Sequence, residues 1–424
     1  MRFLSPHLIT TILFLILGCS STKETSQEKI KGLPYDPSGS TITTNKTIYP
    51  QHKRTFLFSG SKLYVSNEFT GSRLNDFYQE NDSTFIAVIE PENSPINNSA
   101  WYSFKIWSEK NREINLKILY KDGSHRYVPK LSYDGKYWRP IDSNFYFNDT
   151  SKGIANLKLK LKPDTIWVSA QELFLSKDYE RWIDELIWKS FVKKSSIGQS
   201  VNGRAINKLE ISEGRDNSDL VFIIGRQHPP EVTGAFALKS FVEKLTDDSE
   251  ISRIFRERFR VVVVPLVNPD GVDEGHWRHN SNGVDLNRDW FAFNQPETRL
   301  VRDELLRIVS ESKGKVKFFI DFHSTQQDVF YITSRDSTLS IDPIYETTKS
   351  WLNRIQEMFP DYKLNVDESL NDYNAPTSDG WAYNIFNAPA LTYELGDETD
   401  RALIRKICSG AAEAMMEILI KDKK

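Results

Sequence analysis

The chain has 424 residues, which is long enough for two domains and a leader segment. Its 55 Lys and Arg residues nearly balance its 58 Asp and Glu residues, so the formal net charge is −3. A charge so close to zero gives no indication of binding to nucleic acid, and no nucleic-acid partner is expected.

The first residues of the chain have the pattern of an export signal. Arg2 is followed by an apolar run over residues 8–17, which is too short to span a bilayer comfortably, and then by Cys19. This order resembles a bacterial lipoprotein signal. The resemblance implies that residues 1–18 are a signal peptide cut before Cys19, whose thiol would carry diacylglycerol. An ordinary secretory signal with an incidental cysteine is the alternative.

A lipid on Cys19 would anchor the protein to a membrane. The expected location is the cell envelope of a Gram-negative bacterium, either facing the periplasm or at the outer membrane. Residues 19–49 are polar and rich in Ser, Thr and Lys, which predicts a flexible tether.

Residues 50–172 contain several short runs in which apolar and polar side chains alternate. Phe104 and Ile106 belong to one run, and residues 114–118 and 157–161 form others. A period of two predicts β-strands, and the turn-forming clusters between them predict an antiparallel β-sandwich domain. We expect this domain to pack on the next one and to form one wall of its cleft, although it carries no obvious catalytic group. A folding aid without influence on substrate choice is the alternative.

Residues 176–424 combine buried strands with helices, which indicates the α/β fold class. Four short apolar runs predict the strands. They are residues 221–224, 259–266, 316–321 and 390–393. Helical patterns are found at residues 178–192, 296–309 and 403–419.

Polar residues follow three of these strands. His228 and Glu231 come after the first strand at the start of a helix, His323 comes after the third, and Glu394 comes directly after the fourth. Open α/β sheets bind ligands at this edge. Two imidazoles and one carboxylate make a catalytic zinc site with a position open for water, whose pKa falls to about 7. The sequence therefore predicts a zinc site, with Glu394 able to serve as its base.

Three further candidates lie between the second and third predicted strands. Arg288 can hold a carboxylate through two parallel hydrogen bonds, and Asn287 adds a neutral donor. Arg278 can polarise a carbonyl and stabilise a developing oxyanion. Structural ion pairs are the alternative for both arginines.

At these positions the chain resembles the M14 family of zinc metallocarboxypeptidases, over roughly residues 180–424. The resemblance implies a mixed sheet flanked by helices over residues 176–424, with one Zn²⁺ per catalytic domain. The matching motifs stand in the family's order. They are His228 with Glu231, residues 268–271, residues 285–288, His323, and Glu394 within residues 392–397.

The resemblance also implies a role for each candidate. The two histidines and Glu231 would hold the zinc, and Glu394 would be the general base that passes a proton from the attacking water to the leaving amine. Arg278 would polarise the scissile carbonyl. Asn287 and Arg288 would hold the substrate's terminal carboxylate, so the implied activity is removal of single residues from the C-terminus of peptides.

Two pocket residues follow from counting back from Glu394. The position of the family's mobile tyrosine falls on Asp372, so a loop shift of a single residue would put Tyr373 in that role. Asp379 falls near the position that lines the side-chain pocket, where family members that remove Lys or Arg carry an acidic residue. An ordinary loop aromatic and a solvent-facing or turn-capping carboxylate are the alternatives.

Residues 98–104 resemble the β domain that precedes the catalytic domain in cytosolic carboxypeptidases and their bacterial relatives. Those cytosolic enzymes trim acidic residues, but Asp379 and the export signal argue against that substrate here. A second enzyme hypothesis is a carboxypeptidase or amidase acting on peptidoglycan stem peptides. A catalytically dead, lipid-anchored binding module is the non-enzyme alternative, and the presence of all four zinc-site residues argues against it.

Overall fold

The computed structural model describes residues 47–214, 218–336, 338–369 and 376–422. The predicted signal peptide, Cys19 and Tyr373 lie outside the described residues, as does most of the predicted tether. All described residues fall within one compact unit of the chain.

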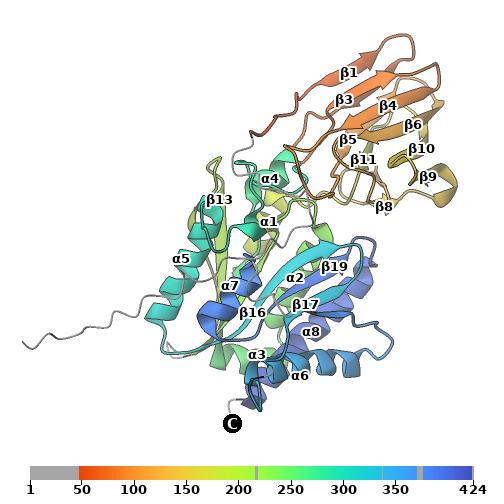
Figure 1. Ribbon diagram of the computed structural model, residues 1–424. Coiled ribbons are helices and arrows are strands. Elements are labelled where there is room, and N and C mark those ends of the chain that lie inside the picture. Colours follow the sequence, from red (N-terminus) through yellow and green to blue (C-terminus); the bar gives the residue numbers. More distant parts are fainter. Residues whose placement is uncertain (1–46, 215–217, 337, 370–375, 423–424) are drawn as a thin grey trace, which may run out of the picture. The chain divides into compact units, whose positions relative to one another are not determined.

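Two β-sheets form the N-terminal part of the chain (Figure 1). Their strands are β1 (Thr55–Phe58), β2 (Leu63–Ser66), β3 (Asp76–Gln79), β4 (Thr84–Ile89), β5 (Ser103–Ser108), β6 (Arg112–Tyr120), β7 (Lys130–Ser132), β8 (Arg139–Pro140), β9 (Tyr146–Asp149), β10 (Ile154–Leu161) and β11 (Ile166–Ser169). A 3-10 helix, η2 (Ser143–Phe145), precedes β9. One sheet has the order β1-β2-β5-β11-β7-β8 and the other β3-β4-β6-β10-β9.

The two sheets share one apolar core. Phe104 and Ile106 of β5 and Leu116 and Ile118 of β6 are fully buried in it. The alternating runs are therefore strands, as predicted. The expectation of purely antiparallel pairing is wrong at β4 and β6, which pair in parallel. The reason is the path of the chain, which leaves β4 for β5 in the other sheet and then returns to β6. The chain reverses direction twice on this path, so β6 runs in the same direction as β4.

The C-terminal part contains an eight-stranded sheet. Its strands are β12 (Val192–Gln199), β13 (Ala205–Ile211), β14 (Asp219–Gly225), β15 (Phe259–Val264), β16 (Val316–Thr325), β17 (Val329–Thr333), β18 (Val366–Ser369) and β19 (Ala390–Gly396). Their order is β12-β13-β15-β14-β16-β19-β17-β18. The central strands β15, β14, β16 and β19 are parallel, whereas β13 and β17 run antiparallel to their central neighbours, so the predicted mixed sheet is confirmed.

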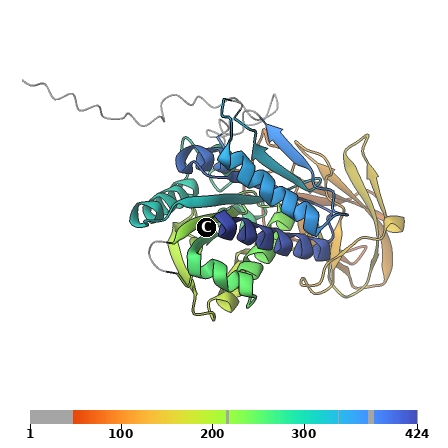
Figure 2. The same ribbon diagram turned by 90° about the horizontal axis from the view of Figure 1, so that it is seen from below.

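Helices cover both faces of this sheet. They are α1 (Ser176–Leu186), α2 (Val232–Leu245), α3 (Glu250–Arg258), α4 (Pro269–Glu274), α5 (Pro296–Glu311), α6 (Pro343–Met358), α7 (Ser378–Phe386) and α8 (Arg401–Asp422), with a 3-10 helix η3 (Leu286–Arg288). Residues of α2, α6 and α8 share a core with Ile223 of β14, and residues of α5 and α7 share another with Phe222. In Figure 2, α8 (dark blue) lies alongside α6 (lighter blue). Burial on both faces explains the uninterrupted apolar sequence of β14.

Several predicted boundaries shift. The first helix ends at Leu186 because the chain enters β12 at Val192. The predicted turn at residues 268–271 begins α4, where the Asn268 side chain accepts a hydrogen bond from the Gly271 amide at 2.9 Å. Leu403, predicted on the buried stripe of α8, is 37% exposed. No helix in the described part of the chain has both the length and the apolar character needed to cross a membrane.

Candidate metal centre and its cavity

The candidate metal ligands lie at the edge where β14 and β16 end. His228 follows the end of β14 at Gly225, and Glu231 is the N-cap residue of α2. His323 lies within β16, near its end, rather than after the strand. Gly234 of α2 permits a close approach to that strand, because a Cβ atom there would lie 2.4 Å from the carbonyl oxygen of His323. Gly234 therefore lets α2 and β16 lie close enough together for Glu231 and His323 to contact each other.

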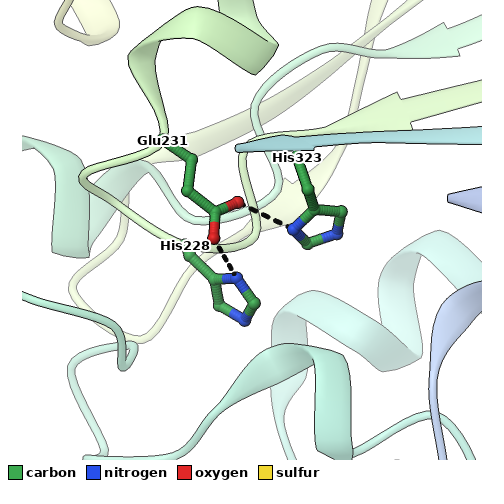
Figure 3. A group of neighbouring side chains, drawn as sticks. All are labelled: His228, Glu231 and His323. Carbon is green, nitrogen blue, oxygen red and sulfur yellow. Dashed lines mark hydrogen bonds and ion pairs between the residues drawn. The ribbon is translucent and has the colours of Figure 1, made fainter. Parts of the chain in front are cut away.

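His228, Glu231 and His323 converge on one point (Figure 3). Glu231 lies between the two imidazoles, with Oε1 2.7 Å from His228 Nδ1 and Oε2 2.7 Å from His323 Nδ1. One potential ligand atom from each residue lies within 4.8 Å of the others, and all three residues are buried. This is the donor set of a catalytic zinc site.

The other nitrogen of each imidazole faces a carboxylate of its own. His228 Nε2 is 2.9 Å from Asp285 Oδ1, and His323 Nε2 is 2.8 Å from Asp321 Oδ2. Such outer carboxylates orient metal-binding imidazoles. Burial opposes a charge on His323, but Asp321 and Glu231 raise its pKa well above the usual value. The cluster therefore favours a positive charge at its centre, and its residues fit Zn²⁺.

Glu394 lies next to this centre on the neighbouring strand. β16 and β19 pair in parallel with Glu394 opposite His323, so the residue predicted to follow β19 lies inside it. Burial and the charge of Glu231 raise the pKa of Glu394 to about 7, although His323 and His228 oppose the shift. A carboxyl group with a pKa near neutrality can both accept and release a proton.

Arg278 and the metal centre share a carboxylate. Asp285 accepts a hydrogen bond from Arg278 Nε through Oδ2 and faces His228 through Oδ1. Burial opposes ionisation, but the charges of Arg278 and His228 hold the pKa of Asp285 well below its usual range. One side chain thus fixes both a ligand and the arginine that lines the cavity.

Asn287 and Arg288 line the same cavity from η3. The Asn287 side-chain oxygen accepts hydrogen bonds from Gln227 Nε2 at 3.1 Å and from the Ser378 amide at 3.0 Å. Its amide nitrogen lies 3.5 Å from His323 Nε2, a long contact that a carboxylate acceptor could replace. Arg288 Nη1 donates to the carbonyl oxygen of Asn287 at 2.9 Å.

Asp379 also lines this cavity, from the first turn of α7. It is only 7% exposed, which is at odds with the solvent-facing alternative. Burial raises the pKa of Asp379, as does the charge of Asp321, while hydrogen bonds with Thr377 and with the Gly380 amide lower it. The contact with Gly380 fits the turn-capping alternative. Within the described residues Asp379 has no ion-pair partner.

The site includes two residues that sequence reasoning missed, one in the cavity wall and one behind a metal ligand. Arg126, between β6 and β7, brings the N-terminal part of the chain into the wall, and its Nε is 2.8 Å from Asp397 Oδ2. Nothing in the sequence around Arg126 signals this position. Asp285 stands two residues before Asn287 in a motif already singled out, so its place in that motif was an available signal.

Comparison with known proteins finds carboxypeptidases similar in sequence and in fold. The profile of the family described as zinc carboxypeptidase matches residues 179–408. An uncharacterized protein of Zymomonas mobilis is 24% identical over 274 residues, which are 62% of this chain and 68% of that protein. Cytosolic carboxypeptidase 6 of Mus musculus is 25% identical over 281 residues, which are 60% of this chain and 52% of that protein. The chain spans about half the length of this second relative.

Solved structures show the same fold. A metallo-carboxypeptidase from Burkholderia cenocepacia has a TM-score of 0.68 at 18% identity, covering 85% of this chain and 98% of the other. A metallo-carboxypeptidase from Pseudomonas aeruginosa, in complex with (2-guanidinoethylmercapto)succinic acid, has a TM-score of 0.69 at 18% identity, covering 84% of this chain and 99% of the other. Both likenesses extend over the N-terminal sheets as well as the mixed sheet.

We predict that Asp285→Asn lowers the affinity for Zn²⁺ about 10–100-fold, because the His228 ring loses its charged partner. Competition with a chromogenic chelator measures this affinity. Asp289→Asn is the matched control, since Asp289 is buried and accepts hydrogen bonds from the Asn294 and Gln295 amides but touches neither imidazole. Equal losses in the two variants would contradict the role of Asp285.

Proposed function

Because this chain belongs to the zinc carboxypeptidase family, we propose that it is a hydrolase that removes single residues from the C-terminus of peptides. The observation that carries the proposal is the grouping of the three-residue metal centre with Glu394, Arg278, Asn287 and Arg288 around one cavity. Each chemical task of peptide hydrolysis has a candidate side chain within it.

His228, Glu231 and His323 would hold the zinc ion. When bound, zinc supplies Lewis-acid activation of water and of a carbonyl oxygen. Glu394 would accept a proton from the attacking water and give it to the leaving amine, a double task that suits its pKa of about 7. The cation, by offsetting the charge of Glu231, would lower that pKa somewhat and leave Glu394 ionised at neutral pH.

The two arginines and Asn287 would bind the substrate on either side of the residue that is removed, at the scissile carbonyl and at the terminal carboxylate. Arg278, oriented by Asp285, would donate to the scissile carbonyl oxygen as negative charge develops on it. Arg288 and the Asn287 amide nitrogen would hold the terminal carboxylate. A substrate without a free carboxylate would offer these donors no negatively charged terminus, so the proposed activity is that of an exopeptidase.

We propose that the residue removed carries a basic side chain. Asp379 is a buried carboxylate in the cavity wall without an ion-pair partner among the described residues, and a Lys or Arg side chain would complete the pair. An acidic residue would place a second negative charge beside Asp379. Tyr373, whose position lies outside the described residues, remains the candidate for the family's mobile tyrosine.

The domain organisation and the location remain proposals as well. We propose an N-terminal β-sandwich domain over residues 50–172 and a catalytic domain over residues 176–424, joined to a lipid-modified Cys19 by a tether over residues 19–49. The shared core of the two N-terminal sheets supports the first domain. The order of basic, apolar and cysteine residues at the N-terminus supports the anchor and a place in the cell envelope.

Glu394→Gln is expected to keep zinc and to lose turnover, because the ligand set remains while the base is removed. The expected fall in kcat on peptides is about 10²–10⁴-fold, measured with metal analysis on the same samples. Glu417→Gln is the control, since it breaks only a pair with Arg354, 2.7 Å apart, outside the cavity. Full activity in Glu394→Gln would refute the proposed mechanism.

Asp379→Asn is expected to reduce kcat/KM for peptides ending in Lys or Arg by at least about 30-fold, equivalent to about 2 kcal/mol for a buried charge pair. Peptides ending in Leu serve as the internal control and should change little. Competition between the two peptides in one reaction, followed by mass spectrometry, measures the ratio. An unchanged ratio would show that Asp379 does not select the side chain.

Cys19→Ala is expected to release the protein from the membrane fraction of the producing bacterium, because the thiol that would carry the lipid is removed. Fractionation with immunoblotting checks this outcome, and the mass of the mature N-terminal peptide checks the modification. A wild-type protein found only in the soluble fraction would contradict the anchor.

A further inference from the structure

Glu92, a buried carboxylate from the N-terminal part of the chain, binds the backbone at Arg278. Glu92 follows β4 and is fully buried. Its Oε2 accepts a hydrogen bond from the Trp277 amide at 2.7 Å, and its Oε1 accepts from the Arg278 amide at 3.0 Å and the His279 amide at 2.7 Å. Three consecutive amides therefore donate to one side chain.

The electrostatics favour a charged Glu92. Burial alone would raise its pKa, but His276, His279 and Arg73, together with the Trp277 amide, lower the pKa to about 2. Hydrogen bonds to an ionised acceptor are roughly twice as strong as those between neutral groups. Glu92 therefore binds this backbone more firmly than a neutral side chain could.

Neighbouring contacts hold the same segment on both sides of Arg278. Arg73 Nη1 donates to the carbonyl oxygen of Gly275 at 3.1 Å, and Asn93 Nδ2 donates to that of Gly283 at 3.1 Å. Asn93 Oδ1 is also 2.6 Å from His279 Nδ1. All of these side chains precede β5, far in sequence from the segment that they hold.

The Trp277 side chain adds an apolar anchor. It is fully buried in the core shared by the two N-terminal sheets, edge-on to Tyr120 with ring centroids 6.4 Å apart. Gly123 makes room for it, because a Cβ atom there would lie 2.5 Å from the indole ring. The residue directly before Arg278 is thus part of the N-terminal core.

We propose that Glu92 is a positioning residue for Arg278, so that the N-terminal part of the chain sets the geometry of the arginine that stabilises the transition state. Glu92 fixes the backbone of Arg278, while Asp285 fixes its guanidinium group. The proposal rests on the proposed function, in which Arg278 donates to the scissile carbonyl oxygen. It gives Glu92, which carries no catalytic signal in the sequence, a part in positioning the catalytic arginine.

A positioning role has a kinetic signature that a purely structural role lacks. An interaction made only in the transition state lowers kcat and kcat/KM equally and leaves KM unchanged. A displacement of about 1 Å can cost about 10²-fold in rate. Because Glu92 would act through Arg278, its loss should matter little once Arg278 is absent.

Glu92→Gln tests this in the full-length, zinc-loaded protein. Gln keeps the volume but turns an NH₂ group toward one of the backbone amides. We expect kcat to fall about 10²-fold with KM unchanged within about twofold. In an Arg278→Ala background, the same substitution should change kcat by less than about threefold.

Glu172→Gln is the matched control. Glu172 is also a carboxylate outside the mixed sheet that pairs with the C-terminal part, through Arg401 Nε and Nη2 at 2.9 Å each. It does not touch the segment that carries Arg278. We therefore expect Glu172→Gln to leave kcat unchanged, even if it lowers the stability of the protein.

Hydrogen exchange tests the contact without relying on activity. The amides of Trp277, Arg278 and His279 should exchange faster in Glu92→Gln than in the wild type or in Glu172→Gln. If the Gln variant does not fold, Glu92→Asp, which withdraws the carboxylate by one methylene, is measured by the same criteria. A wild-type protein inactive on every peptide would refute the proposed function, while the exchange rates would still decide whether Glu92 holds this segment.

Two results would overturn the positioning role. One is an equal fall in kcat with and without Arg278. The other is unchanged exchange at the three amides in both Glu92 variants.

Discussion

Two imidazoles, each lying between two carboxylates, form the constraint on which the rest of the site depends. The Glu231 carboxylate faces Nδ1 of both His228 and His323, while Asp285 and Asp321 face the opposite nitrogens. So many buried negative charges are costly without a compensating cation. The local charge therefore favours a metal ion. Because β19 pairs with β16, Glu394 lies near the charge of Glu231, which raises its pKa.

The order of strands in the mixed sheet converts distant residues into neighbours. β14 and β16 pair in parallel, so residues at their ends meet at one edge although His228 and His323 are far apart in sequence. The N-terminal sheets then complete the surroundings from outside this sheet. Arg126 enters the cavity wall, and Glu92 and Trp277 tie the segment of Arg278 to the N-terminal core.

The sequence predicts much of this because the relevant signals are local. A strand buried on both faces, such as β14, reads as a continuous apolar run, and ligands three residues apart at a helix start form a short motif. The contact of Glu92 with Trp277 joins residues 185 positions apart and leaves no periodic signal. The parallel pairing of β4 and β6 also leaves no local signal, because it depends on β5 joining the other sheet. Cys19 and Tyr373 stay predictions because they lie outside the described residues.

The proposed function requires this cavity to cleave the last peptide bond of a chain with a free carboxylate. The most direct test incubates the zinc-loaded protein with two peptides of one sequence ending in Lys, one with a free C-terminus and one amidated, and follows both by mass spectrometry. We expect loss of the single terminal residue from the free acid and little or no reaction of the amide. Equal cleavage of both peptides, or cleavage at internal bonds, would contradict it.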